Sequence, residues 1–248
     1  MTLTDLMNRR ATVRQYTSRP VGDDLLNRLL ETAARTPTMG NLQLYSVVVT
    51  RDDGMKRRLA PAHFNQSMVT EAPVVLTICA DFNRTTRWCE CRRAQAGYGN
   101  VLSFLNAATD ALLYTQTLTA LAEAEGLGTC FLGTTIYQPQ AIIDALALPR
   151  LVMPVATLTL GWPAEESAPS DRLPPASFVH RERYADYTPE AIDTYYTPKE
   201  QLPENLRFVE INGKDTLAQV YAEIRYKRAD NEALSASLLK ALESQGFL

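Results

Sequence analysis

Apolar residues recur along the chain with two different spacings, and these predict helices that alternate with strands. Helical patterns cover residues 2–9, 23–35, 53–60, 64–71, 103–125, 139–146, 189–196 and 214–245, the last one broken near Asp230. Short apolar runs that are typical of buried strands cover residues 44–50, 73–80, 129–132 and 155–160. Because helices separate the strands, the sequence predicts an α/β or α+β sandwich around a single sheet.

The segment 103–125 carries the longest helical pattern of the chain. Its apolar residues surround almost the whole helix, and they are Phe104, Leu105, Ala108, Ala111, Leu112, Leu113, Leu118, Leu121 and Ala122. A helix that is apolar on most sides is buried on most sides. We therefore expect this helix at the centre of a domain or in a dimer interface.

The first polar stretch with candidate chemistry is Arg10-Ala11-Thr12-Val13-Arg14. In an extended chain, Arg10, Thr12 and Arg14 lie on one side, because they are two residues apart. Two guanidinium groups and a hydroxyl there suit a phosphate or an electron-rich ring oxygen, through charge-assisted hydrogen bonds. A solvated edge strand produces the same pattern, so the residues alone leave both interpretations open.

Two further stretches lie beside predicted strands. Thr36–Gln43 places hydroxyl and amide groups just before a strand, where they could read the edge of a planar heterocycle or simply form a turn. Gly133 and Thr134 follow the strand 129–132, and their backbone N–H groups could approach a ring that a side chain at Gly133 would obstruct. In a late loop, Arg172 could supply another anion contact.

Composition and charge narrow the classes of function. The chain has 248 residues, 46% of them hydrophobic and 21% charged, which is typical of a folded protein, and its net charge of −3 disfavours general nucleic-acid binding. Its four cysteines and two histidines have no ligand spacing, so we expect no metal site. The opening residues lack a secretion-signal pattern, and no apolar stretch reaches the roughly 20 residues of a membrane span. We expect a cytoplasmic protein without nucleic-acid or membrane partners.

The sequence also lacks the common signatures of side-chain catalysis. GxSxG, HExxH, the P-loop and paired carboxylates at helical spacing are all missing from it. Together with the anion-binding and ring-edge candidates, this favours chemistry carried out by a bound cofactor, with no catalytic side chain.

In their order along the chain, these stretches resemble the FMN-dependent nitroreductase and flavin reductase family. That family opens with Arg-x-Ser-x-Arg and an aromatic residue, which Arg10, Thr12, Arg14 and Tyr16 match with Thr in place of Ser. The later matching motifs are Thr38–Gln43, Gln66 ahead of Glu71-Ala72-Pro73, Gly126–Gly133, and Leu160–Pro163 with Arg172 beyond. Residues 79–84 are similar to the oxygen-insensitive, NADPH-using branch. The resemblance covers residues 5–185.

The resemblance implies an α+β fold, a nitroreductase-like sandwich with a central mixed, mainly antiparallel sheet flanked by helices. It also implies an interlocked homodimer with two FMN sites at the interface. Residues 1–185 would form the FMN-binding domain. Residues 186–248 would form a mostly helical extension that packs on the same domain or on the dimer partner.

At the phosphate end of FMN, the resemblance assigns contacts to Arg10 and Arg172, and it places Thr12 at the phosphate or the ribityl oxygens. Ser170 stands where relatives have a lysine. We therefore expect either weaker FMN binding or the substitution of Arg181 or Arg183 for the lysine.

At the ring end, the resemblance assigns contacts to the following residues. Arg14 and Gln66 would lie near the N1–C2=O edge, the amides of Gly133 and Thr134 would face N5 and O4, and Thr38, Met39, Asn41 and Gln43 would approach the flavin, partly from the opposite subunit.

The implied activity is hydride transfer from NAD(P)H to an electron-poor acceptor (a nitroaromatic, a quinone or a similar compound) by a ping-pong mechanism. Flavin N5 would carry the chemistry, and Arg14 would stabilise the negative charge of the reduced ring. Two alternatives remain open. One is a flavin reductase that releases reduced FMN, which Ser170 mildly favours. The other is a non-catalytic dimer that binds flavin or a nucleotide.

Overall fold

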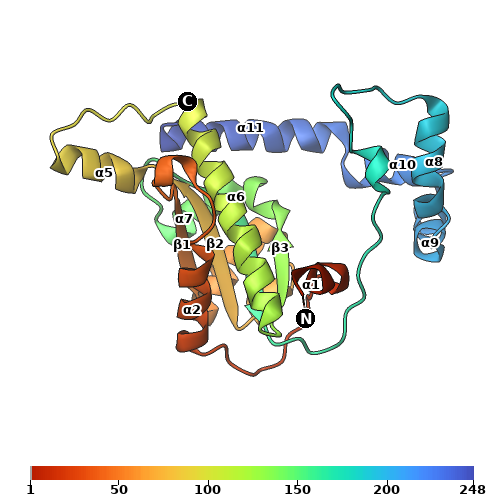
Figure 1. The fold of residues 1–248 in the computed structure, drawn as a ribbon, viewed down its shortest axis with the longest axis horizontal. Coiled ribbons are helices and arrows are strands. Elements are labelled where there is room, and N and C mark those ends of the chain that lie inside the picture. The colour runs from red at the N-terminus through yellow and green to blue at the C-terminus, as the bar shows by residue number, and fades with distance from the viewer. Residues whose placement is uncertain (1) are drawn as a thin grey trace. The chain divides into compact units, whose positions relative to one another are not determined.

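The computed structural model describes residues 2–248, and their contacts divide the chain into two compact units (Figure 1). The first unit contains the residues up to 169 together with 234–248, and the second contains 170–233. The sequence predicted a single boundary at 185/186. The last residues return to the first unit because Ala241, Leu242 and Phe247 are buried in its hydrophobic core.

A four-stranded sheet forms the centre of the first unit. Its strands are β1 (Tyr45–Thr50), β2 (Val74–Asp81), β3 (Gly128–Leu132) and β4 (Val152–Gly161), in the order β1-β2-β4-β3. Every residue of β2 and β4 is buried, as their central positions require. The mainly antiparallel sheet is confirmed: all three neighbouring pairs are antiparallel, and residues 2–248 contain no parallel pair of the kind that a mixed sheet would have.

Helices cover this sheet at bounds close to those that the sequence predicts. They are α1 (Leu3–Arg9), α2 (Asp23–Ala33), α3 (Asp53–Leu59), α4 (Met68–Glu71), α5 (Asn83–Cys91), α6 (Val101–Ala124) and α7 (Pro139–Leu146). The sequence pattern did not indicate α5, because most of its residues are polar and no apolar stripe marks it. None of the helices within 2–248 is both long and apolar enough to cross a membrane.

The long helix α6 contacts all four strands, and Figure 1 shows it running along the sheet. Asn100 caps its start by accepting a hydrogen bond from the Ser103 amide. One face is buried against the core, whereas Leu102, Leu105, Leu112 and Leu113 are exposed, at 66, 55, 43 and 45%. In a single chain the helix is therefore buried on one face only, and the burial on most sides that the sequence predicted is not found within it.

The second unit is helical. It contains α8 (Pro189–Glu200), α9 (Pro203–Ile211), α10 (Leu217–Gln219), a π-helical turn (Val220–Arg225) and the start of α11 (Arg228–Gln245). Two details correct the prediction. The chain contains the helix α9, and the break in the predicted helix 214–245 follows the π-helical turn at Tyr226 instead of lying near Asp230.

The segment after α1 runs along the outer edge of β3 in an extended conformation. The Val13 amide donates to the Thr129 carbonyl at 2.9 Å, and Tyr16 forms an isolated bridge with Pro163. This approach requires glycine at position 128, because a Cβ there would lie 2.6 Å from the Val13 Cβ. Gly128 and Val13 thus fix the position of the polar segment that contains Arg10, Thr12 and Arg14.

The close approach gives a first prediction. Gly128→Ala should lower the free energy of unfolding by about 1–3 kcal/mol, as overpacking in a core does, and Val13→Gly in the same chain, which removes the clashing Cβ, should restore part of it. Gly133→Ala is the matched control, because a Cβ at Gly133 would meet no atom within 4 Å. Urea unfolding of the purified protein measures both variants. Equal stability of Gly128→Ala and the wild type would show that the contact is not tight.

Candidate functional site

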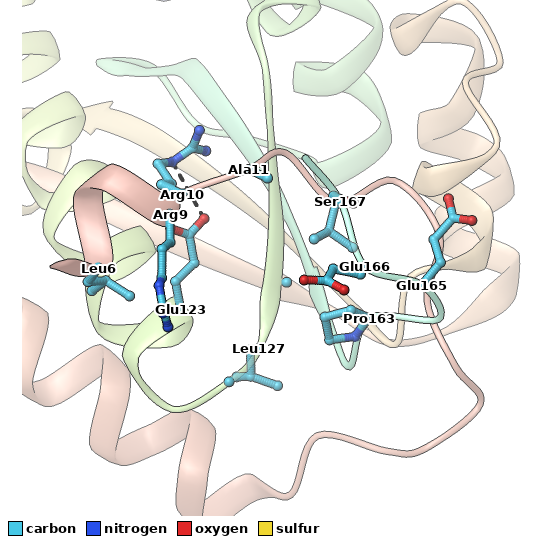
Figure 2. A pocket seen from close by; sticks show the side chains of 13 residues that line it. Leu6, Arg9, Arg10, Ala11, Glu123, Leu127, Pro163, Glu165, Glu166 and Ser167 are labelled. Atoms are coloured by element: carbon cyan, nitrogen blue, oxygen red, sulfur yellow. Dashed lines mark ion pairs between the residues drawn. The ribbon is translucent and has the colours of Figure 1, made fainter. Parts of the chain in front are cut away.

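The first cluster of site residues lies where α1 ends and the chain passes β3. Arg10 caps the end of α1, and its Nε lies 3.5 Å from the Glu123 Oε1. Figure 2 shows this pair at the side of a pocket of about 300 Å³, with Glu165 and Glu166 across from it. Nε of Arg10 is turned towards Glu123, and its two terminal nitrogens make no hydrogen bond within residues 2–248.

Glu123 supports Arg10, and no motif in the sequence indicated it. Its side chain is only 9% exposed, and the Thr129 hydroxyl donates to its Oε1. Burial raises the pKa of the Glu123 carboxyl, while the bond from Thr129 and the charge of Arg10 act in the opposite direction. Arg10 itself is partly buried, so it is not the fully solvated edge residue that the second interpretation of the motif required.

The other residues of the opening motif follow the alternation of an extended chain. Val13 is buried, and its neighbours Thr12 and Arg14 are more exposed. Arg14 lies close enough to Tyr16 and Cys130 that its charge lowers the pKa of both, against the stronger effect of burial, which raises them. The motif therefore presents Thr12 and Arg14 on the outer side of the β3 edge.

A second cluster forms at the end of β3, where the chain enters a short 3-10 helix (Gly133–Ile136). The Thr134 hydroxyl lies 2.8 Å from the Nδ1 of His63, and the Gln66 side-chain amide donates to the His63 carbonyl at 3.1 Å. His63 is completely buried, and burial lowers its pKa to about 4, so it is neutral near pH 7. His63 thus joins two predicted motifs, those of Gln66 and of Gly133-Thr134.

The third cluster is the turn before β1. Gly40, Asn41 and Gln43 have φ angles of 55°, 57° and 47°, in the left-handed region that glycine and asparagine tolerate best. The Gln43 side-chain amide donates to the Asn41 Oδ1 at 2.6 Å. The turn is therefore an unusual conformation that its surroundings must stabilise.

Two charged side chains from other elements hold this turn. The buried Asp110 of α6 accepts hydrogen bonds from the Met39 amide at 2.9 Å and the Leu44 amide at 3.1 Å. The guanidinium of Arg84 donates to the carbonyl of Gln43. Asp110 had no signal in the sequence, because a single carboxylate inside an apolar helix has no motif around it.

One chain does not bring the three clusters together. The turn with Thr38, Met39, Asn41 and Gln43 precedes β1, and the other two clusters border β3, so they occupy opposite edges of the sheet. Three strand spacings of about 4.8 Å separate these edges, roughly 14 Å in all.

Arg172 belongs to the second unit, where its guanidinium donates to the carbonyls of Ser170 and Asp171.

Comparison with known proteins identifies the fold and its relatives. The nitroreductase family matches residues 7–162. The chain belongs to the nitroreductase family. It is 33% identical to the FMN reductase [NAD(P)H] of Bacillus subtilis, over 95% of this chain and 93% of that one. It is 30% identical to the oxygen-insensitive NADPH nitroreductase of Salmonella typhimurium, over 81% of this chain and 80% of that one.

A solved structure from Bacteroides fragilis has the same fold as this member of the nitroreductase family. The two share 56% identity and a TM-score of 0.97, over 98% of this chain and 99% of that one. The resemblance that the motifs indicated is therefore confirmed at the level of the family and of the fold.

The support of the turn gives a second prediction. Asp110→Asn replaces one carboxylate oxygen with an N–H₂ group, so one of the two backbone amides loses its acceptor. We expect the free energy of unfolding to fall by about 2–3 kcal/mol, and the amides of Met39 and Leu44 to exchange hydrogen at least tenfold faster. Asp144→Asn, the same change at an exposed position of α7, is the control. Unchanged exchange at both amides would mean that Asp110 does not hold the turn.

Proposed function

We propose that this nitroreductase-family chain is an FMN-dependent oxidoreductase that uses NAD(P)H, and that two copies of it share each flavin site. When bound, FMN supplies the chemistry by accepting a hydride from the nicotinamide and reducing an electron-poor acceptor, such as a nitroaromatic or a quinone. The observation that carries the proposal is the placement of the candidate flavin contacts at opposite edges of one sheet. Relatives named FMN reductase and NADPH nitroreductase support the activity.

The residues along β3 fit one side of the flavin. Arg10 offers two terminal nitrogens to the phosphate, Thr12 lies beside it, and Arg172 is a further candidate for the phosphate. Gly133 has open space where a side chain would stand, so a planar ring can reach the backbone amides of Gly133 and Thr134. Arg14 and Gln66 are the proposed contacts at the N1–C2=O edge. No step requires a proton from these residues; they bind and orient the cofactor.

A second copy would complete the site. The exposed leucines of α6 (Leu102, Leu105, Leu112 and Leu113) form an apolar face that a dimer would bury. The same association would bring the partner's turn, with Thr38, Met39, Asn41 and Gln43, to the flavin bound along β3. We accordingly propose a homodimer, in the cytoplasm.

A flavin reductase that releases reduced FMN is the second candidate. Ser170 stands where a lysine was expected, and Arg172 bonds to carbonyls of its own loop. Both features favour loose phosphate binding.

Arg14 gives a third prediction. Arg14→Ala removes the fixed cation from the ring edge, so the reduction of bound FMN by NADPH should slow by about a hundredfold or more, which corresponds to roughly 3 kcal/mol, and the flavin potential should fall. Stopped-flow absorbance and a potentiometric titration measure the two effects. Arg57→Ala, an exposed arginine on α3, should change neither. A wild-type rate and potential in Arg14→Ala would remove Arg14 from the site.

The spectrum of the purified protein tests the proposed function. We expect bound flavin, its rapid bleaching by NADPH without air, and its recovery when a quinone is added. Rapid gel filtration of the bleached protein then separates the two candidates, because only a flavin reductase would lose the reduced FMN. A protein that takes up no FMN, or whose flavin NADPH does not bleach, would contradict the proposal.

A further inference from the structure

His63 is a completely buried histidine for which the binding of FMN leaves no assigned role. It ends the short 3-10 helix Ala60–His63, in which Ala60 and Ala62 belong to an apolar cluster. The other members of this cluster are Leu59, Met68, Val69, Cys130, Leu132 and Ile142. Burial in these surroundings keeps the ring neutral, so it carries a single N–H.

The two ring nitrogens have different surroundings. Nδ1 lies 2.8 Å from the Thr134 hydroxyl, whereas Nε2 is buried and has no hydrogen-bond partner within residues 2–248. A proton on Nε2 would create a buried N–H without an acceptor, which is rare in proteins. A proton on Nδ1 is instead donated to the Thr134 hydroxyl. Nε2 is then an acceptor without a donor, which costs less than a buried N–H without an acceptor. The geometry therefore favours the tautomer that is protonated at Nδ1.

This tautomer determines what the Thr134 hydroxyl can do. A hydroxyl has one proton, and its oxygen can accept while that proton is donated elsewhere. If Thr134 accepts from His63, its own proton is not used inside the protein. Thr134 is partly exposed and follows the open position of Gly133, so the proton can be directed out of the core.

We propose that His63 is a positioning residue: its Nδ1–H donates a hydrogen bond to the Thr134 hydroxyl, whose own O–H then donates a hydrogen bond to the flavin edge at O4. This inference rests on the proposed flavin site and deepens it. The side chain of Thr134 adds a hydrogen bond to those of the two backbone amides. Because the direction of this donor is fixed before the ring gains charge, it favours the reduced flavin without reorganisation.

Histidine-selective ¹⁵N NMR tests the tautomer directly. The chain has only two histidines, His63 and His180, so a His180→Gln variant assigns both signals. We expect a pyrrole-type shift for Nδ1 of His63 and a pyridine-type shift for Nε2, in the flavin-free and the FMN-loaded protein. The reverse pattern would overturn the proposal, because the hydroxyl of Thr134 would then donate to His63.

A double-mutant cycle tests the effect on the flavin. His63→Leu and Thr134→Val should each lower the flavin potential and slow FMN reduction by NADPH about tenfold, and the double variant should be no slower than either. His63→Leu should fold, because Leu is apolar and suits the buried cluster. Ile142→Ala, a cavity in that cluster, controls for packing and should leave the potential unchanged.

The outcomes of the cycle separate a positioning role from a structural one. Additive losses, or a fall in potential with Ile142→Ala as large as with His63→Leu, would reduce His63 to a packing residue. If the protein bound no FMN, the proposed function and the donation to the flavin would both fail. The NMR result on the flavin-free protein would still decide the direction of the bond between His63 and Thr134.

Discussion

The order of strands in the sheet determines where the candidate site residues of this protein lie. With β1 and β3 at opposite edges, three strand spacings, roughly 14 Å, separate the turn before β1 from the residues along β3 within one chain. The polar motifs at both edges nevertheless match the motifs of the nitroreductase family, and they follow one another in the same order along the sequence. The proposed cofactor site between two copies reconciles these facts, and the exposed leucines of α6 would supply the apolar surface for such an association.

Each cluster of the site is held by one buried polar side chain from another element. Glu123 of α6 pairs with Arg10, Asp110 of α6 binds the turn before β1, and His63 binds Thr134. A buried polar group is costly unless it is paired, so each of these residues specifies one arrangement of its partner. Because α6 provides two of the three, the helix that carries the proposed dimer face also organises both edges of the site.

The sequence predicted those features of the protein that depend on repeated patterns of residues. Apolar periodicity located the strands and most helices, and the family motifs identified the family. Glu123, Asp110 and His63 carried no pattern, since each is a single polar residue whose partner lies far away in the sequence. The helix α5 was missed because it is polar, and the break at Tyr226 was misplaced because a π-helical turn has no apolar period. The exposed face of α6 was visible in the sequence only as an excess of apolar residues.

The sharing of each flavin site between two copies is the central claim, and a mixed dimer tests it most directly. Arg14→Ala alters the side along β3, and Asn41→Asp places a negative charge in the turn while keeping a residue that tolerates its backbone angle. A dimer with one chain of each kind would have one site with both substitutions and one with neither. If each flavin site is shared, half of the flavin in this dimer is reduced by NADPH at the wild-type rate. If each site lay within one chain, every site would carry one substitution, and no flavin would be reduced at that rate.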